Sequence, residues 1–177
     1  MHETTQDLQA LQRLLDQSYA AAGEHLLSIH TPERRLTAEQ LAQRLSGMCL
    51  LTLATTTRDG RPITGPVDGL FFRGAFWFGS APSSLRFRHI RARPHVSATH
   101  LPGEQLGVTV HGTAHEIDLA DPAHEGFRDF CVEIYGEGWN DWGVGTPEAG
   151  ATYARIDATR IFTFHLDPDE EDPEDNP

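Results

Sequence analysis

The feature that most constrains the fold is a change of hydrophobic period near Met48. Before it, apolar side chains recur every three or four residues, which is typical of amphipathic helices. From Met48 onward the period is two, and strand-forming residues dominate, as in "MCLLTLATTT". Asp-Gly in the turn 58–61 and Arg-Gly at 73–74 separate successive runs by hairpin-length turns. Most of the chain therefore has to form consecutive antiparallel strands.

The pattern predicts a mainly β, α+β chain in which helices flank a small antiparallel barrel. We expect strands at 48–57, 62–72, 75–80, 95–101 and 107–118, with one or two more in 151–167. We expect helices at 5–22, 36–47, 83–94 and 122–136, and a connector at 28–35. Thr37 and Gln40 form a capping box at the start of the second helix.

Charge and composition limit the functions that the chain can have. The net charge is -12, of which seven negative charges lie in "DPDEEDPEDNP" from Asp167. This balance argues against a general nucleic-acid binder, which needs a basic face. The apolar runs are too short to span a bilayer and the N-terminus lacks the order of a signal peptide, so we expect a cytoplasmic protein without membrane contact. We divide the chain into a helical extension (1–46), a barrel domain (47–166) and a disordered acidic tail (167–177).

A cluster of hydroxyl and guanidinium groups stands out in this acidic chain. The turn Gly79-Ser80-Ala81-Pro82-Ser83-Ser84 leads directly into the helix that carries Arg86. A helix N-terminus presents unpaired backbone N–H groups, and an arginine adds a fork that fits a phosphate. The sequence is equally consistent with an ordinary N-capped helix with a solvated basic face. In that helix we expect Leu85, His89 and Ile90 to point inward, with Arg86, Arg88 and Arg91 at its edge or outside.

Three further groups of residues are candidate sites. His111 and His115 are four residues apart on a predicted strand, about 13 Å from each other, so we predict no metal site there. Cys49 and Cys131 lie among apolar neighbours and are expected to be buried free thiols. The segment 135–143 contains Trp139 and Trp142, which can either cover a planar cofactor or pack against the barrel.

Taken together, these motifs resemble the FMN-binding split-barrel family, which includes pyridoxamine 5'-phosphate oxidases and their F420-dependent relatives. The likeness rests on "DGRP", "GSAPSSLR", "RPHVSATH" and "VHGTAHEI", in that order, from about Leu45 to Leu119. It implies a six-stranded antiparallel split barrel with an N-terminal helical extension. No GxSxG, Walker A or strand-linked GxGxxG motif points to another enzyme class.

The resemblance also implies a cofactor between the two subunits of a homodimer, because so small a barrel has little room inside for a flat ring. FMN is the expected cofactor, F420 the alternative and haem a more distant one. The resemblance places the ring beside one strand, the phosphate at the hydroxyl-arginine cluster and an aromatic residue over the ring. The implied contacts are Thr64, Gly65, Pro66, Val67 and Asp68 for the ring, Gly79, Ser80, Ser84, Arg86 and Arg88 for the phosphate, and Trp139 or Trp142 as the cover.

The sequence departs from true pyridoxamine phosphate oxidases at its C-terminal end. Those enzymes grip the substrate phosphate with basic residues there, whereas this chain has only Arg155 and Arg160 before an acidic tail. We therefore expect an FMN-dependent oxidoreductase with another small, planar substrate. The alternatives are an F420-dependent reductase, which the wider patch of Arg88, Arg91 and Arg93 could serve, a non-catalytic flavin or haem carrier or sensor, and a split barrel with an empty site.

Overall fold

The computed structural model describes residues 1–143 and 150–166, apart from the side chain of Trp142. Its elements follow the chain in an order that alternates helices with antiparallel strands. They are α1 (Thr5–Ala20), α2 (Glu24–Ile29), η1 (Pro32–Arg34), α3 (Ala38–Arg44), β1 (Met48–Thr56), β2 (Pro62–Phe72), β3 (Ala75–Ser80), α4 (Leu85–Ala92), β4 (His95–Gly103), β5 (Leu106–Ile117), η2 (Pro122–His124), α5 (Glu125–Tyr135), α6 (Trp139–Trp142) and β6 (Thr152–His165).

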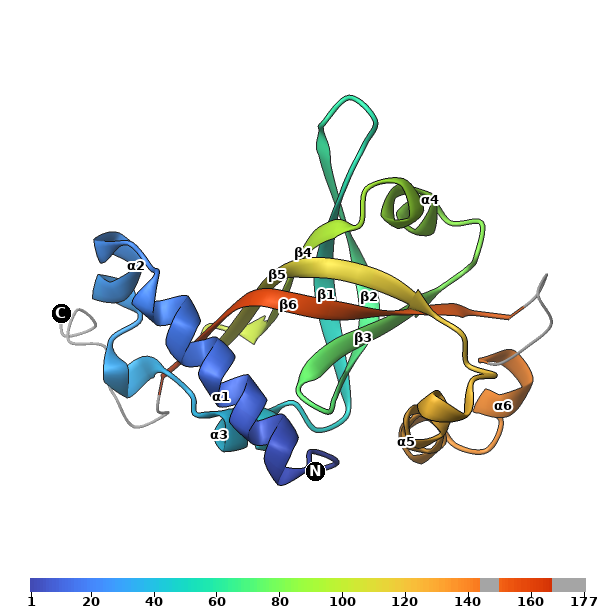
Figure 1. Cartoon of the computed structure of the whole chain (residues 1–177), viewed down its shortest axis with the longest axis horizontal. Coiled ribbons are helices and arrows are strands. Elements are labelled where there is room, and N and C mark those ends of the chain that lie inside the picture. Colours follow the sequence, from blue (N-terminus) through green and yellow to red (C-terminus); the bar gives the residue numbers. More distant parts are fainter. Residues whose placement is uncertain (144–149, 167–177) are drawn as a thin grey trace, which may run out of the picture.

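The six strands close into an antiparallel barrel in the order β1-β2-β3-β6-β5-β4, which confirms the predicted fold class. β1 pairs with β2 from Met48–Leu70 to Thr56–Pro62, and with β4 on its other side. The stretch 151–167, where one or two strands were expected, contains the single long strand β6. Figure 1 shows α1 lying across β6, while α5 and α6 lie near the opposite end of the barrel and α4 lies beside the β1–β2 hairpin.

The alternation of the strands produces the barrel core. Leu51 and Leu53 of β1, Val108 and Val110 of β5, and Ile156 of β6 are all at most 2% exposed and belong to one cluster. Because successive strand residues point to opposite faces, the intervening side chains face outward. The side chains of the core thus fill the interior, so a ligand as large as a flat ring would have to lie on the outer wall.

The N-terminal helices share this core. Leu11 and Leu15 of α1 and Leu41 of α3 are buried in the same cluster as the barrel residues. The predicted helices 5–22 and 36–47 correspond to α1 and α3, and the capping box of Thr37 and Gln40 is formed. The connector prediction for 28–35 was incomplete. The last turn of α2 reaches into that segment, and η1 lies inside it.

A second apolar cluster fixes α5 and α6 to the outside of β2 and β3. The Trp77 ring stacks on Phe127 of α5 with ring centroids 4.3 Å apart, and Phe72 stacks on Phe130 at 5.3 Å. α5 corresponds to the helix predicted at 122–136, which begins with a 3-10 turn. In the two described ranges, no helix combines the length and the apolarity that crossing a bilayer requires.

Candidate functional site: an anion cradle beside an outer-wall cavity

The site is built around the N-terminus of α4, where β3 ends. The Ser84 hydroxyl accepts a hydrogen bond from the backbone N–H of Phe87 at 3.3 Å and so caps the helix. The Ser84 N–H in turn donates to the Ala81 carbonyl at 2.9 Å, which closes the turn between β3 and α4. Ser84 therefore caps α4, as the interpretation of an ordinary N-capped helix required. The position of Arg86 decides whether the turn can also hold an anion.

Phe87 and Ile90 form the buried side of α4, and this corrects one prediction. His89 and Ile90 are buried as expected, but Leu85 is 47% exposed and Phe87 is completely buried. Phe87 and Ile90 are three residues apart and share one face, whereas Leu85 falls on the opposite side of the helix. The His89 Nδ1 lies 2.9 Å from the Thr55 hydroxyl of β1, a buried polar contact that fixes α4 against the barrel.

Arg86 joins three elements in one place. Its Nη1 donates to the Ser80 hydroxyl at the end of β3 at 3.2 Å, and its Nη2 donates to the Pro66 carbonyl of β2 at 2.7 Å. Gly65 lies alongside, because a Cβ there would be 3.6 Å from Nη2 of Arg86. Burial lowers the pKa of Arg86 from its usual value. Arginine nevertheless stays protonated in proteins, so the site carries a positive charge.

This charge has no acidic partner in the described part of the chain, where Arg61, Arg91 and Arg155 are the arginines that form ion pairs. A half-buried, unpaired guanidinium is electrostatically costly, and a bound anion would offset that cost. The Ser80 hydroxyl and the nearby start of α4 add donors of the kind that phosphate oxygens require. Ser80, Ser84 and Arg86 thus form an arrangement that could hold an anion, which we call the anion cradle.

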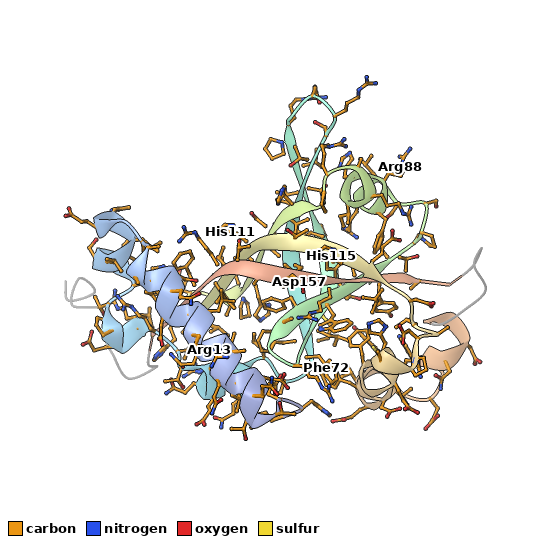
Figure 2. All side chains as sticks on the ribbon, in the orientation of Figure 1. Arg13, Phe72, Arg88, His111, His115 and Asp157 are labelled. Atoms are coloured by element: carbon orange, nitrogen blue, oxygen red, sulfur yellow. The ribbon has the colours of Figure 1, made fainter. Side chains whose placement is uncertain are left out.

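The other arginines of α4 have different positions. Arg91 forms a two-pronged ion pair with Glu116 of β5, at 2.7 and 2.6 Å, and donates to the Pro82 carbonyl at 2.8 Å. Arg93 donates to the Thr56 carbonyl at 2.8 Å. Arg88 is exposed on α4 (Figure 2), and because it is two residues from Arg86 it lies on a different face of the helix. In the basic patch of Arg88, Arg91 and Arg93, two of the three side chains therefore form contacts within the protein.

The segment from Thr64 to Asp68 has an unusual edge. β1 covers one side of it, with Ala54 opposite Thr64 and Leu50 opposite Asp68. On the other side, β2 pairs with β3 only from Gly69 to Phe72. Thr64, Pro66 and Asp68 are exposed, whereas Val67 is buried. This part of β2 therefore presents a backbone edge without a strand partner, next to the anion cradle.

A cavity of about 350 Å³ adjoins the cradle, because Ser80 is one of its lining residues. It lies between the end of β3, β2, β6 and α5. Its lining residues are Asp68, Leu70, Trp77, Phe78, Gly79, Ser80, Ala81, Tyr135, Gly150, Ala151 and Tyr153. Gly79 has a clear steric role, because a Cβ there would be only 2.8 Å from Cε1 of Tyr153. The Tyr153 ring can lie against β3 only because residue 79 has no side chain.

Trp139 does not cover the site. It is fully buried in the second apolar cluster, and its Nε1 donates to the Tyr153 hydroxyl at 2.8 Å. A side chain without exposed surface cannot close over a ring, so the packing alternative describes Trp139. The side chain of Trp142, the other candidate, lies outside the described part of the structure, as does the acidic tail 167–177.

The histidine and cysteine candidates have separate partners. The His111 Nδ1 lies 2.8 Å from the Ser97 hydroxyl, while His115 lies 3.6 Å from Asp157. The residues that the structure describes contain no cluster of three potential metal ligands. Both cysteines are free and buried, and burial raises the pKa of Cys49 to about 11 and that of Cys131 to about 12. Thiols protonated to this degree are poor nucleophiles at neutral pH.

Comparison with known proteins identifies the family. Residues 37–166 match the family model described as pyridoxamine 5'-phosphate oxidase. The chain belongs to this family. The matched residues include all six strands, α4 and α5, and therefore the anion cradle and the cavity described above.

Solved structures with the same fold come from diverse bacteria. A conserved hypothetical protein from Mycobacterium tuberculosis is 20% identical with a TM-score of 0.62, covering 76% of this chain and 88% of its own. An FAD-binding protein from Mesorhizobium loti is 22% identical with a TM-score of 0.56, at 73% and 93% coverage. A haem storage protein from Vibrio cholerae is 16% identical with a TM-score of 0.58, at 71% and 91% coverage. No curated protein gives a significant match.

Tyr135 lines the cavity from α5 and belongs to the aromatic segment 135–143 that the sequence had indicated. Two other site residues of this pyridoxamine 5'-phosphate oxidase family member were not recognised in the sequence. Glu116 anchors Arg91 from β5, and Tyr153 lines the cavity from β6. These contacts depend on which strands become neighbours in the closed barrel, which no local pattern records. One signal was available in the sequence, because Gly79 interrupts an aromatic strand and a glycine there often marks a close approach.

Proposed function

We propose that this protein is an FMN-dependent oxidoreductase of the pyridoxamine 5'-phosphate oxidase type. The observation that carries the proposal is the half-buried Arg86, which has no acidic partner among the described residues and lies at the start of α4 against Ser80 and Pro66. A phosphate monoester carries close to two negative charges near neutral pH, and this donor set fits it. The FAD-binding Mesorhizobium structure shows that this fold can hold a flavin.

In this proposal the chain contributes binding and orientation. Ser80, Ser84 and Arg86 would hold the phosphate, while the unpaired edge of β2 from Thr64 to Asp68 would offer backbone groups to the ring. A bound flavin supplies the hydride or electron transfer itself. The chain needs no side-chain nucleophile for such chemistry, which agrees with the inert, buried thiols.

FMN is favoured over F420 by the distribution of charge around the cradle. F420 adds an acidic tail to its phosphodiester, and that tail would need further free cations. Of the three arginines that could serve such a tail, Arg91 is committed to Glu116 and Arg93 to the Thr56 carbonyl, which leaves Arg88. Haem is disfavoured because its iron needs an axial ligand, such as a histidine, a methionine, a thiolate or a tyrosinate. The cavity is lined by Tyr135 and Tyr153, but burial raises the pKa of both and disfavours the tyrosinate form. Among the described residues, no histidine lines the cavity beside the cradle.

We further propose that the protein is a homodimer with the cofactor at the subunit interface. β1 and β4 are antiparallel neighbours in which Leu51 pairs with His100. Leu50 and Leu101 lie next to this pair, one on each strand. Their side chains are 56% and 66% exposed, and Met48 on the same strand is 49% exposed. A second copy that covers this outer face would remove apolar surface from water and shield a ring lying along β2.

Reconstitution with FMN tests the function. We expect the purified chain to retain or take up a chromophore with the visible bands of a flavin rather than a deazaflavin or a haem Soret band. Stopped-flow mixing with NADPH, NADH or dithionite, followed by oxygen or quinones, should then show turnover faster than with free FMN. Tight binding without turnover for every donor and acceptor would instead favour a flavin carrier, and failure to bind any flavin would contradict the proposal.

A further inference from the structure

The cavity beside the cradle combines apolar walls with few polar groups. Leu70, Trp77 and Ala151 supply apolar side chains to a volume of about 350 Å³, whereas the Phe78 side chain belongs to the barrel core and Phe78 only borders the cavity from β3. The Trp77 ring is held in place by its stack on Phe127 and by a hydrogen bond from Nε1 to the Phe72 carbonyl at 3.1 Å. Rigid aromatic walls of this kind favour a flat ligand.

Two tyrosines border the cavity with protonated hydroxyls. Burial raises the pKa of Tyr153 to about 12. The pKa of Tyr135 is raised further, first by burial and then by the negative charge of Asp68. The Tyr153 oxygen already accepts a hydrogen bond from Trp139 at 2.8 Å, so the Tyr153 hydroxyl can still donate its own proton.

The charge that borders the cavity is negative. Asp68 lines it, and no arginine, lysine or histidine is among the lining residues that the structure describes. Arg155 lies near Trp77, with its Cζ 5.9 Å from the ring centroid, but it forms an ion pair with Asp157 at 3.1 Å. Arg86 reaches the cavity only through Ser80. If a cofactor phosphate occupies the cradle, it neutralises Arg86 and leaves Asp68 uncompensated.

We propose that this cavity is the substrate pocket, that it takes a planar molecule which is neutral or cationic, and that an ammonium or N–H group of the substrate pairs with Asp68. This inference rests on the proposed function, because a pocket next to the cradle serves catalysis only if a flavin is bound there. A phosphate or carboxylate of a substrate would be repelled by the Asp68 carboxylate. It would also lose its hydration without gaining a counter-ion in the cavity. The pocket thus differs in charge from one built to grip a substrate phosphate.

A matched pair of probes tests the inference. Binding of 2-naphthylmethylammonium and of 2-naphthoate is measured by calorimetry, with the chain free and loaded with FMN. We expect the loaded chain to bind the ammonium probe at least about tenfold more tightly than the carboxylate. Asp68→Asn should abolish this preference, while Glu104→Gln, which removes one charge from the exposed β4–β5 turn, should preserve it. FMN affinity is measured for every variant.

Each outcome separates the two proposals. Equal or tighter binding of 2-naphthoate, an unchanged preference in Asp68→Asn, or no binding of either probe would overturn the inference while leaving FMN binding intact. Competition between the probe and FMN would also overturn it, because the cavity would then receive the cofactor ring itself. Binding of the ammonium probe to a chain that binds no flavin would support the charge preference and refute the proposed oxidoreductase.

Discussion

At the residue scale, Gly79 allows the cavity to exist. An alanine Cβ would lie 2.8 Å from Cε1 and 2.9 Å from Cζ of Tyr153, a buried ring held by Trp139. We expect Gly79→Ala to lower the free energy of unfolding by about 1–3 kcal/mol, since crowding of this kind forces a shift in a packed region. Urea denaturation checks this, and Gly138→Ala is the control because a Cβ there meets nothing within 4 Å. Equal stability of the two variants would show that Tyr153 can move at little cost.

The sequence indicated which residues belong to the site more readily than which residues contact one another there. The sequence singled out Arg86 and Ser80 because hydroxyls, a turn and a helix start occur together locally. It did not indicate that Arg86 would bridge to the Pro66 carbonyl, because that contact joins residues 20 positions apart. Leu85 was misplaced for a local reason, since the exact start of a short helix decides which face is inside.

At the element scale, the loop before α4 depends on β5. Arg91 connects the two, because it pairs with Glu116 and also holds the Pro82 carbonyl. We expect Glu116→Gln to weaken FMN binding by about three- to tenfold, because the loop that carries the cradle loses its anchor. Stability should change by less than about 1 kcal/mol, as is usual for partly exposed ion pairs.

FMN titration and urea denaturation of the same samples check both parts. Asp59→Asn is the control, because it breaks the exposed Arg61–Asp59 pair, which spans 2.7 Å in the β1–β2 hairpin. If both variants bind FMN as the unmodified chain does, the ion pair of Arg91 does not position the loop.

The strands themselves were predictable from their period of two and their turns. The position of β6 between β3 and β5 was not, because barrel closure joins segments that are far apart in the sequence.

At the scale of the whole molecule, the proposed dimer places the outer face around Leu50 at the subunit interface. We expect the unmodified protein to be a dimer and Leu50→Asp to be a monomer, because a buried carboxylate without a partner is costly at an interface. Size-exclusion chromatography with light scattering measures this. Ile29→Asp on α2, where the side chain is 42% exposed, is the matched control and should remain dimeric. An unmodified chain that binds FMN as a clean monomer would contradict the dimer.

The central claim is that Arg86 holds a flavin phosphate, and FMN titration of two arginine variants tests it most directly. Arg86→Ala should reduce FMN affinity by about 30-fold, which corresponds to roughly 2 kcal/mol for a lost charge-assisted contact. Arg88→Ala removes the same charge from the exposed side of the same helix and should reduce it by less than about fivefold. A large loss in Arg86→Ala alone is the predicted result. Unchanged affinity in Arg86→Ala, or equal losses in both variants, would contradict the account.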